Sequence, residues 1–318
     1  MAGYIVRRLL LVGIVLGAVS LLVFLIIFAL PGSVAHLILG PLAGPEDVRA
    51  IELKLGLNDP LWLQYWHWAS RLVAGDLGNS LLMDRPVGPL VGTALAHSLT
   101  LGIAAFALIA LIGVGLGVLA ALNHNTRLDH AISLTTYLGI AVPEFFWAIV
   151  VILIFAAYLG WLPATGYEPL TSGFGIWAKH LIAPTMTLVF AHLAHVSRLT
   201  RSSMIEVLRS PYVTAARAKG LPERVVVVRH ALRNALLPTI TVLALDIGRL
   251  IGGIVVIETV FAYPGLGRLL VFSIQQRDIP VLQAVILVVA AAFALANLAA
   301  DLLYAWLNPK IRYGGSIA

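Results

Sequence analysis

Charged side chains inside long apolar stretches are the first residues of this chain that could do chemistry. Glu144 follows Pro143, and Asp246 and Arg249 lie three residues apart, which places them on one face of a helix. A charge in a bilayer is costly unless it is paired or hydrated. Two interpretations follow. Arg249 pairs internally with Asp246 or Glu144, or the three residues line a path for a charged or zwitterionic solute.

Two histidines also have a spacing that could serve a ligand. His192 and His195 are three residues apart and could hold a metal, but no third ligand is nearby in sequence. Polar packing inside the protein is therefore favoured. Cysteine is absent, which excludes a disulfide, a thiolate metal site and a cysteine nucleophile.

Glycine motifs and catalytic motifs indicate no enzyme. The chain contains neither Gly-Lys-Ser nor Gly-Lys-Thr, so it does not hydrolyse nucleotide by a P-loop. Gly113, Gly115 and Gly117 lie in an apolar stretch without a preceding strand, which favours close helix packing over dinucleotide binding. Gly252 and Gly253 are interpreted in the same way. An intramembrane enzyme ranks last, because no His-Glu-x-x-His motif and no convincing Ser/His or Asp pair is present.

The composition is that of a chain that lies mostly in lipid. Of its 318 residues, 60% are hydrophobic and 11% are charged, and the mean hydropathy is +0.96. Soluble domains carry roughly 25% charged residues. The net charge of +6 therefore indicates retention of Lys and Arg in cytoplasmic loops rather than nucleic-acid binding.

The hydropathy pattern predicts an all-α integral membrane protein with six spans. A helix needs about 20 apolar residues to cross the hydrocarbon core. The first such run follows Arg7 and Arg8, is too long for a signal-peptide core and is expected to be retained. The six predicted spans are residues 9–30, 98–122, 132–158, 181–200, 235–262 and 281–307.

Lys and Arg give the orientation. They are densest in the segments that face the cytoplasm if the N-terminus is inside, so both termini are predicted to be cytoplasmic. The whole chain, 1–318, is then one transmembrane domain with an extracytoplasmic segment at 31–97. In that segment, residues 61–68 form an aromatic, amphipathic stretch. It predicts a helix on the outer surface, which either only anchors the chain or docks an external partner.

Residues 203–234 form a basic segment between the fourth and fifth spans. Pro211 can begin a helix, which would run over 212–219 and end at Gly220 as a C-terminal cap. Residues 225–232 form a second, apolar-faced piece, and Pro238 is expected to interrupt the entry into the fifth span. A short helix parallel to the membrane can fit a groove on another protein.

This segment resembles the "EAA" loop of ABC importer permeases. The resemblance rests on Ala215-Ala216, Gly220 and Leu237-Pro238, with Thr214 in the place of the family's Glu. The chain resembles in particular the dipeptide/oligopeptide/nickel permeases of the first-subunit type. Further matching motifs lie at residues 55–61, 75–80, 160–167, 198–204, 217–221, 229–235, 258–268, 301–304 and 308–314.

The resemblance implies the rest of a transport machine. It implies the type I importer permease fold in a bacterial inner membrane, a second homologous permease subunit, two ATPase subunits that bind ATP-Mg, and an extracytoplasmic substrate-binding protein. No cofactor, metal or catalytic residue is expected in this chain. The implied ATPase-coupling residues are Tyr212, Thr214, Ala215, Ala216, Arg217, Lys219, Gly220 and Leu221.

The predicted function is thus the translocation-pathway subunit of an ATP-driven importer of di- or oligopeptides or related small solutes. Glu144, Asp246 and Arg249 are the candidates for the substrate path. The alternative is a stand-alone secondary transporter or channel. It would need a self-sufficient ion relay, which these three scattered residues do not evidently form.

Overall fold

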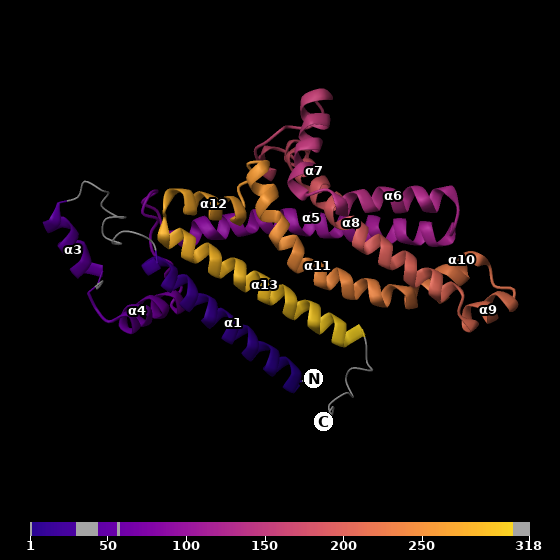
Figure 1. Cartoon of the computed structure of the whole chain (residues 1–318), viewed down its shortest axis with the longest axis horizontal. Helices are drawn as coiled ribbons and strands as arrows, with labels where there is room; N and C mark the ends of the chain where they lie inside the picture. Colours follow the sequence, from indigo (N-terminus) through magenta and orange to yellow (C-terminus); the bar gives the residue numbers. More distant parts are fainter. Residues whose placement is uncertain (1, 30–43, 56–57, 308–318) are drawn as a thin grey trace. The chain divides into compact units, whose positions relative to one another are not determined.

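The computed structural model describes residues 2–29, 44–55 and 58–307, and these residues are almost entirely helical (Figure 1). They form two compact units. One unit contains residues 98–264 and 295–307, and the other contains residues 2–97 and 265–294 within the described ranges. Residues 30–43, 56–57 and 308–318 lie outside the described part, and with them part of the predicted outer segment, part of the 55–61 motif and the 308–314 motif.

Unit 2, residues 2–97 and 265–294, is built from helices with apolar faces. It contains α1 (Ala2–Ala29), α3 (Pro45–Leu55), α4 (Leu61–Val73), the start of α5 (Val87–Leu122), α12 (Leu266–Gln276) and the first part of α13 (Ile279–Leu307). The start of α5 packs against α12 and α13 through Val87, Val91, Leu266 and Val285. Many large apolar side chains of α1 are exposed, as expected for a helix surrounded by lipid.

The predicted aromatic helix at 61–68 is confirmed as part of α4. Its Tyr65 hydroxyl lies 2.8 Å from Ser20 Oγ, and the rings of Phe24 and Tyr65 are 5.4 Å apart. Trp62 and Trp66 are exposed on α4. One face of α4 is therefore held by α1, while the position of the other at the outer membrane surface stays a prediction.

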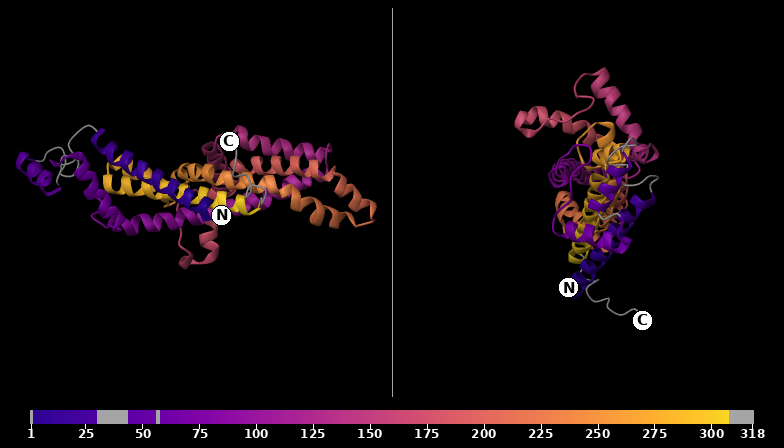
Figure 2. Two further views of the ribbon diagram at one scale, coloured as in Figure 1. Left: turned by 90° about the horizontal axis from the view of Figure 1, so that it is seen from below. Right: turned by 90° about the vertical axis from the view of Figure 1, so that its left-hand side faces the viewer.

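Unit 1 holds most of the candidate residues. Its helices are the rest of α5, α6 (Arg127–Ala141), α7 (Glu144–Val151) continuing as a π-helix (Ile152–Tyr158), a 3₁₀ turn (Leu170–Ser172), α8 (Phe174–Leu208), α9 (Pro211–Ala218), α10 (Glu223–Val225), a second π-helix (Val226–Leu232) and α11 (Arg233–Val260). The helices α6, α7 and α11 all pack against α8 (Figure 1). Figure 2 shows the connection that carries α9 at one end of this unit.

Within residues 2–29, 44–55 and 58–307, five helical stretches are long and apolar enough to cross a membrane. They are Val6–Ile26, Val87–Leu122, Phe174–Leu208, Glu223–Val260 and Ile279–Leu302, and they correspond to the first, second, fourth, fifth and sixth predicted spans. The all-α fold is confirmed. The span count becomes six if the bent pair Arg127–Ala141 and Glu144–Tyr158 crosses the membrane once.

The third predicted span, 132–158, is not one straight helix. It breaks at Val142–Pro143, where the chain bends by 109° between the two helical pieces. Proline disfavours the helical conformation in the residue before it, and Val142 is extended, with φ −105° and ψ 130°. Glu144 thus begins a helix, whereas the sequence placed it at mid-depth of a continuous one.

Pro238 behaves in the opposite way. The predicted interruption before the fifth span does not occur, because Pro238 lies inside α11. Proline removes one backbone hydrogen bond, but a membrane helix tolerates this where its neighbours and local widening satisfy the freed groups. Helical structure runs through the π-helix into α11 without a break, and Glu223–Val260 forms one stretch of 38 residues.

Gly113 and Gly117 of α5 confirm the packing interpretation, whereas a Cβ at Gly115 would meet no atom of the described residues within 4 Å, so close helix packing does not describe Gly115. A Cβ at Gly117 would lie 2.5 Å from Thr200 Cβ and 2.6 Å from the Ser197 carbonyl oxygen on α8. A Cβ at Gly113 would lie 2.8 Å from Val196 Cγ1. The backbones of α5 and α8 therefore approach each other at positions where only hydrogen fits.

This contact gives a stability prediction with a matched control. Gly117→Ala is expected to lower the free energy of unfolding by about 1–3 kcal/mol, because the methyl group overpacks the α5–α8 contact. Gly115→Ala meets no atom within 4 Å and is expected to be neutral or to stabilise by up to about 1 kcal/mol through helix propensity. Thermal unfolding in detergent compares the two variants, and equal melting temperatures would contradict the close contact.

Candidate functional site

The inward face of the short helix α9 packs against the rest of unit 1. Pro211 occupies its first turn, where a missing N–H costs nothing. Val213 and Ala216 are buried with Ala121 at the end of α5 and Met204 of α8. The helix predicted over 212–219 is therefore confirmed as α9. The second, apolar-faced piece predicted at 225–232 contains a π-helix over Val226–Leu232, a conformation that the pattern did not predict.

The end of α9 has the expected glycine. Gly220 has φ +78°, the left-handed conformation that favours glycine, and its N–H donates to the Arg217 carbonyl at 2.9 Å. Asn234 Nδ2 donates to the Tyr212 hydroxyl at 2.8 Å, which ties α9 to α11. The fixed inward face and this cap hold the outward face at a defined orientation.

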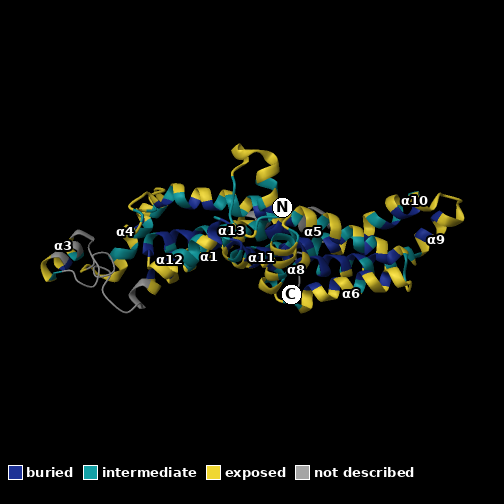
Figure 3. Ribbon diagram, turned by 90° about the horizontal axis from the view of Figure 1, so that it is seen from above, coloured by how far each residue is buried: buried dark blue, intermediate teal, exposed yellow. Residues whose placement is uncertain are grey.

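That outward face consists of most of the sequence-predicted coupling residues. Arg217 lies at its edge, where it pairs with Glu223 at 2.6 Å, and this hydrogen bond raises the pKa of the guanidinium. Ala216 is the exception, since its side chain is buried against the chain itself. It supports the helix rather than facing outward. The exposed set is Tyr212, Thr214, Ala215, Arg217, Lys219, Gly220 and Leu221. Figure 3 shows exposed residues over much of the connection that carries α9 and α10.

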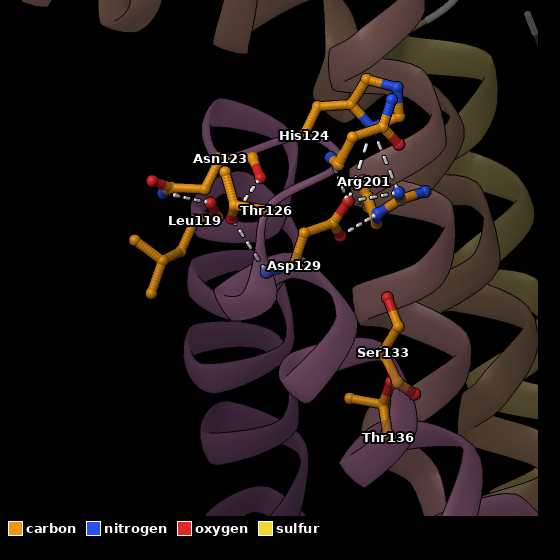
Figure 4. A network of polar contacts seen from close by, with 9 residues as sticks. Leu119, Asn123, His124, Thr126, Asp129, Ser133, Thr136 and Arg201 are labelled. Atoms are coloured by element: carbon orange, nitrogen blue, oxygen red, sulfur yellow. Dashed lines mark hydrogen bonds and ion pairs between the residues drawn. The ribbon is translucent and has the colours of Figure 1, made fainter.

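A buried ion pair lies near the α9 contact (Figure 4). Asp129, at the start of α6, is fully buried and accepts hydrogen bonds from Nε and Nη2 of Arg201 on α8, both at 2.6 Å. The backbone N–H of Asn125 donates to the same carboxylate at 2.9 Å, and His124 Nδ1 is 3.5 Å away. The network fastens the α5–α6 turn to α8 one helical turn before Met204.

Sequence reasoning did not single out Asp129. Thr126 followed three residues later by Asp129 resembles a capping box, and the Asp129 N–H does donate to Thr126 Oγ1 at 3.4 Å. That signal could have found the cap. It could not have found Arg201, which lies 72 residues away in sequence.

A cavity of about 510 Å³ lies between α6, the break at Pro143, α8 and α11. Glu144 and Arg249 both line it, together with His192, His195 and Gly253 among others. Glu144 Oε1 is 3.3 Å from Nε2 of the buried His192. The polar-packing interpretation of His192 is thus confirmed, with Glu144 as the neighbour that sequence reasoning did not predict.

Asp246 and Arg249 form the internal pair that the first interpretation anticipated. Nη1 of Arg249 lies 3.1 Å from Oδ1 of Asp246. The Asp246 side chain is 6% exposed, whereas that of Arg249 is 63% exposed. Pairing and cavity lining therefore do not exclude each other, because Asp246 holds one side of a guanidinium that also faces the cavity.

The glycines of α11 have different surroundings. A Cβ at Gly253 would lie 2.5 Å from Glu144 Oε2. The space beside Gly253 is therefore filled by the Glu144 carboxylate, whereas the sequence predicted a closely packed helix there. Gly252 meets nothing within 4 Å and lines the cavity. Close helix packing thus does not describe Gly252.

Another carboxylate lies inside the helices of unit 1, and it has a hydrogen-bonding partner there. Glu258 is fully buried and accepts a hydrogen bond from Ser98 Oγ at 2.5 Å. Within the described residues, no three or more His, Asp or Glu side chains are placed to hold a metal ion.

Comparison with known proteins shows which family the sequence matches. The family described as "Binding-protein-dependent transport system inner membrane component" matches residues 113–313, and its N-terminal counterpart matches residues 1–98. The dipeptide transport system permease protein DppB of Alkalihalophilus pseudofirmus is 40% identical, covering 98% of this chain and 100% of the relative. The glutathione transport system permease protein GsiC of Escherichia coli strain K12 is 41% identical over the same shares.

A solved structure agrees at the level of the fold. The MetNI methionine ABC transporter, in an inward-facing conformation, superimposes with a TM-score of 0.55 at 17% identity, covering 69% of this chain and 96% of that chain. Likeness at this identity shows that the two chains share a fold.

Proposed function

We propose that this chain, which belongs to the family of binding-protein-dependent transport system inner membrane components, imports peptides or closely related small solutes. It would form the path with a second, similar permease subunit, and the energy would come from ATP-Mg on two separate ATPase subunits. Relatives named for dipeptide and glutathione transport support the peptide class. Membership in the family argues against a stand-alone transporter or channel.

The observation that carries this proposal is the two-sided construction of α9. Its inward face is pinned through Val213 and Ala216, and its outward face is small, polar and basic. A rigid helix with a solvent-exposed face at the end of a membrane unit (Figure 2) suits a groove on a soluble partner. We assign this outward face to contact with the ATPase.

Motion would pass from α9 into the spans through the contacts that hold it. Met204 connects α9 to α8, Ala121 connects it to α5, and the Tyr212–Asn234 hydrogen bond connects it to α11. An ATPase pair that binds one permease conformation better than the other shifts the population toward that conformation. The Asp129–Arg201 pair would make the ends of α5, α6 and α8 move together.

The substrate path is assigned to the cavity that Glu144 and Arg249 line, with Asp246 holding Arg249. The proposal also includes the orientation, with both termini and α9 in the cytoplasm and an extracytoplasmic protein that delivers cargo to the opposite side.

The absence of cysteine allows a direct test, because each introduced cysteine is unique. Ala215→Cys is expected to react with a membrane-impermeant maleimide in inside-out vesicles and not in intact cells. Co-expression of the ATPase subunits that assemble with this chain should protect it. Ala216→Cys, whose position is buried, is the matched control and should stay unlabelled in both preparations.

Two outcomes would contradict the proposal. Labelling of Ala215→Cys from outside intact cells would reverse the orientation. Labelling in inside-out vesicles that is unchanged by the assembled ATPase would mean that the outward face of α9 does not contact it.

A further inference from the structure

The cavity between α6, α8 and α11 has one anionic and one cationic pole. Glu144 supplies the carboxylate and Arg249 supplies the guanidinium, and both line the same space of about 510 Å³. Binding pockets for small molecules have volumes of about 300–1,000 Å³. The cavity is therefore large enough for a small solute with polar ends.

The cationic pole is held from one side and free on the other. Only Nη1 of Arg249 has a hydrogen-bond partner among the described residues, which is Asp246. The second oxygen of Asp246 is buried without such a partner. The buried carboxylate fixes the guanidinium from behind, so its remaining N–H groups can donate to an incoming carboxylate in the planar, two-bond arrangement that arginine favours.

The anionic pole, the Glu144 carboxylate, lies against a buried side chain. Glu144 lies beside Nε2 of His192, a residue that is 5% exposed, and its Oε2 sits against the bare Cα of Gly253. Nε2 of His192 makes no hydrogen bond of good geometry among the described residues. Glu144 thus keeps acceptor capacity for a cationic group in the cavity.

The spacing of the poles indicates the length of the ligand. The Arg249 guanidinium is turned back to Asp246, which lies seven residues before Gly253 on α11, and seven residues of helix rise about 10 Å. Because the Glu144 carboxylate sits at Gly253, the two poles are roughly two helical turns apart along α11. An extended tripeptide spans about 10–11 Å at most, which is close to this separation.

We infer that this cavity binds a zwitterionic solute of about tripeptide length, with its ammonium at Glu144 and its carboxylate at Arg249. The inference rests on the proposed transport function and adds the site and the mode of recognition. It also explains why the charges remain in an apolar part of the chain, where each would be costly without a partner.

The test measures binding to the purified full chain in lipid nanodiscs by ligand-observed NMR titration. The probes are trialanine, N-acetyl-trialanine, trialanine amide and the doubly blocked N-acetyl-trialanine amide. Trialanine is expected to bind about tenfold more tightly than either singly blocked form, since each block removes one charge-assisted contact. Equal binding of all four probes, or no binding of trialanine, would overturn the inference.

Two substitutions assign the ends separately. Glu144→Gln should abolish the preference for a free amino end and leave the preference for a free carboxylate. Arg249→Met should do the reverse. Gly253→Ala, which keeps both charges but displaces Glu144, should weaken the first preference only. A variant that lowers the binding of all four probes equally would contradict its assigned role.

Matched controls separate recognition from folding. Glu206→Gln and Arg209→Met change the same residue types at exposed positions at the end of α8 and should leave all four affinities unchanged. Melting temperatures report whether each variant is folded. If the binding test fails, the result of the maleimide test on α9 does not change. The two tests therefore distinguish a wrong ligand site from a wrong coupling role.

Discussion

Gly220→Trp is expected to reduce peptide uptake by at least about tenfold, which requires a loss of only about 1.4 kcal/mol of ATPase binding, while the chain still inserts into the membrane. Among the described residues, a Cβ at Gly220 meets no atom within 4 Å, so the indole would project outward, onto the proposed contact. The positive φ of +78° adds strain of about 1–2 kcal/mol. Uptake by cells that express the chain with its partner subunits measures the effect, and co-purification of the ATPase locates it.

The controls for Gly220 separate strain from contact. Gly220→Asn is small and tolerates the left-handed conformation, so it should retain most of the uptake. Gly160→Trp introduces the same strain, at φ +65° and equally open surroundings, but away from α9. If Gly160→Trp lost uptake as strongly as Gly220→Trp, or if Gly220→Trp transported normally, the coupling role would be refuted.

Asp129→Asn is expected to lower the free energy of unfolding by about 3 kcal/mol, the low end of the range for breaking a buried ion pair. The substitution keeps the volume of the side chain but leaves Arg201, which is 26% exposed, without a counter-charge. The low end applies because Arg201 keeps some contact with solvent. Unfolding of the purified chain by titration with a denaturing detergent measures the change.

A second ion pair of the same chain provides the comparison. Arg217 and Glu223 are also 2.6 Å apart, but their side chains are 41% and 59% exposed. Exposed pairs contribute little because water screens them, so Glu223→Gln should change the unfolding free energy far less than Asp129→Asn does. Equal effects of Asp129→Asn and Glu223→Gln would mean that burial of Asp129 does not govern its contribution.

Some features of the fold could be predicted because they depend on short-range rules. Apolar runs locate the helices that can span a membrane, since lipid leaves the backbone few alternatives to helix. Pro211 and Gly220 mark the two ends of α9, because proline suits a first turn and glycine suits a left-handed cap. The spacing of Asp246 and Arg249 likewise placed both residues on one helical face, but it left pairing and path lining open as alternatives.

Proline shows where such rules reach their limit. The same residue type breaks the helix at Pro143 and is accommodated inside α11 at Pro238. The local preference is similar at both positions. The outcome depends on whether neighbouring helices and a preceding π-helix can satisfy the freed backbone groups, which the residues around each proline do not reveal.

By itself, the sequence determined that this protein is a helical membrane protein, where α9 begins and ends, and which family its motifs resemble, because hydropathy, capping and motif spacing act between near neighbours. The tertiary structure alone decided which charges meet. It joined Asp129 to Arg201 and Glu144 to His192, turned Ala216 inward, and gathered Glu144 and Arg249 at one cavity. These contacts depend on how distant helices pack, and helix packing brings together residues whose separation in sequence carries no signal.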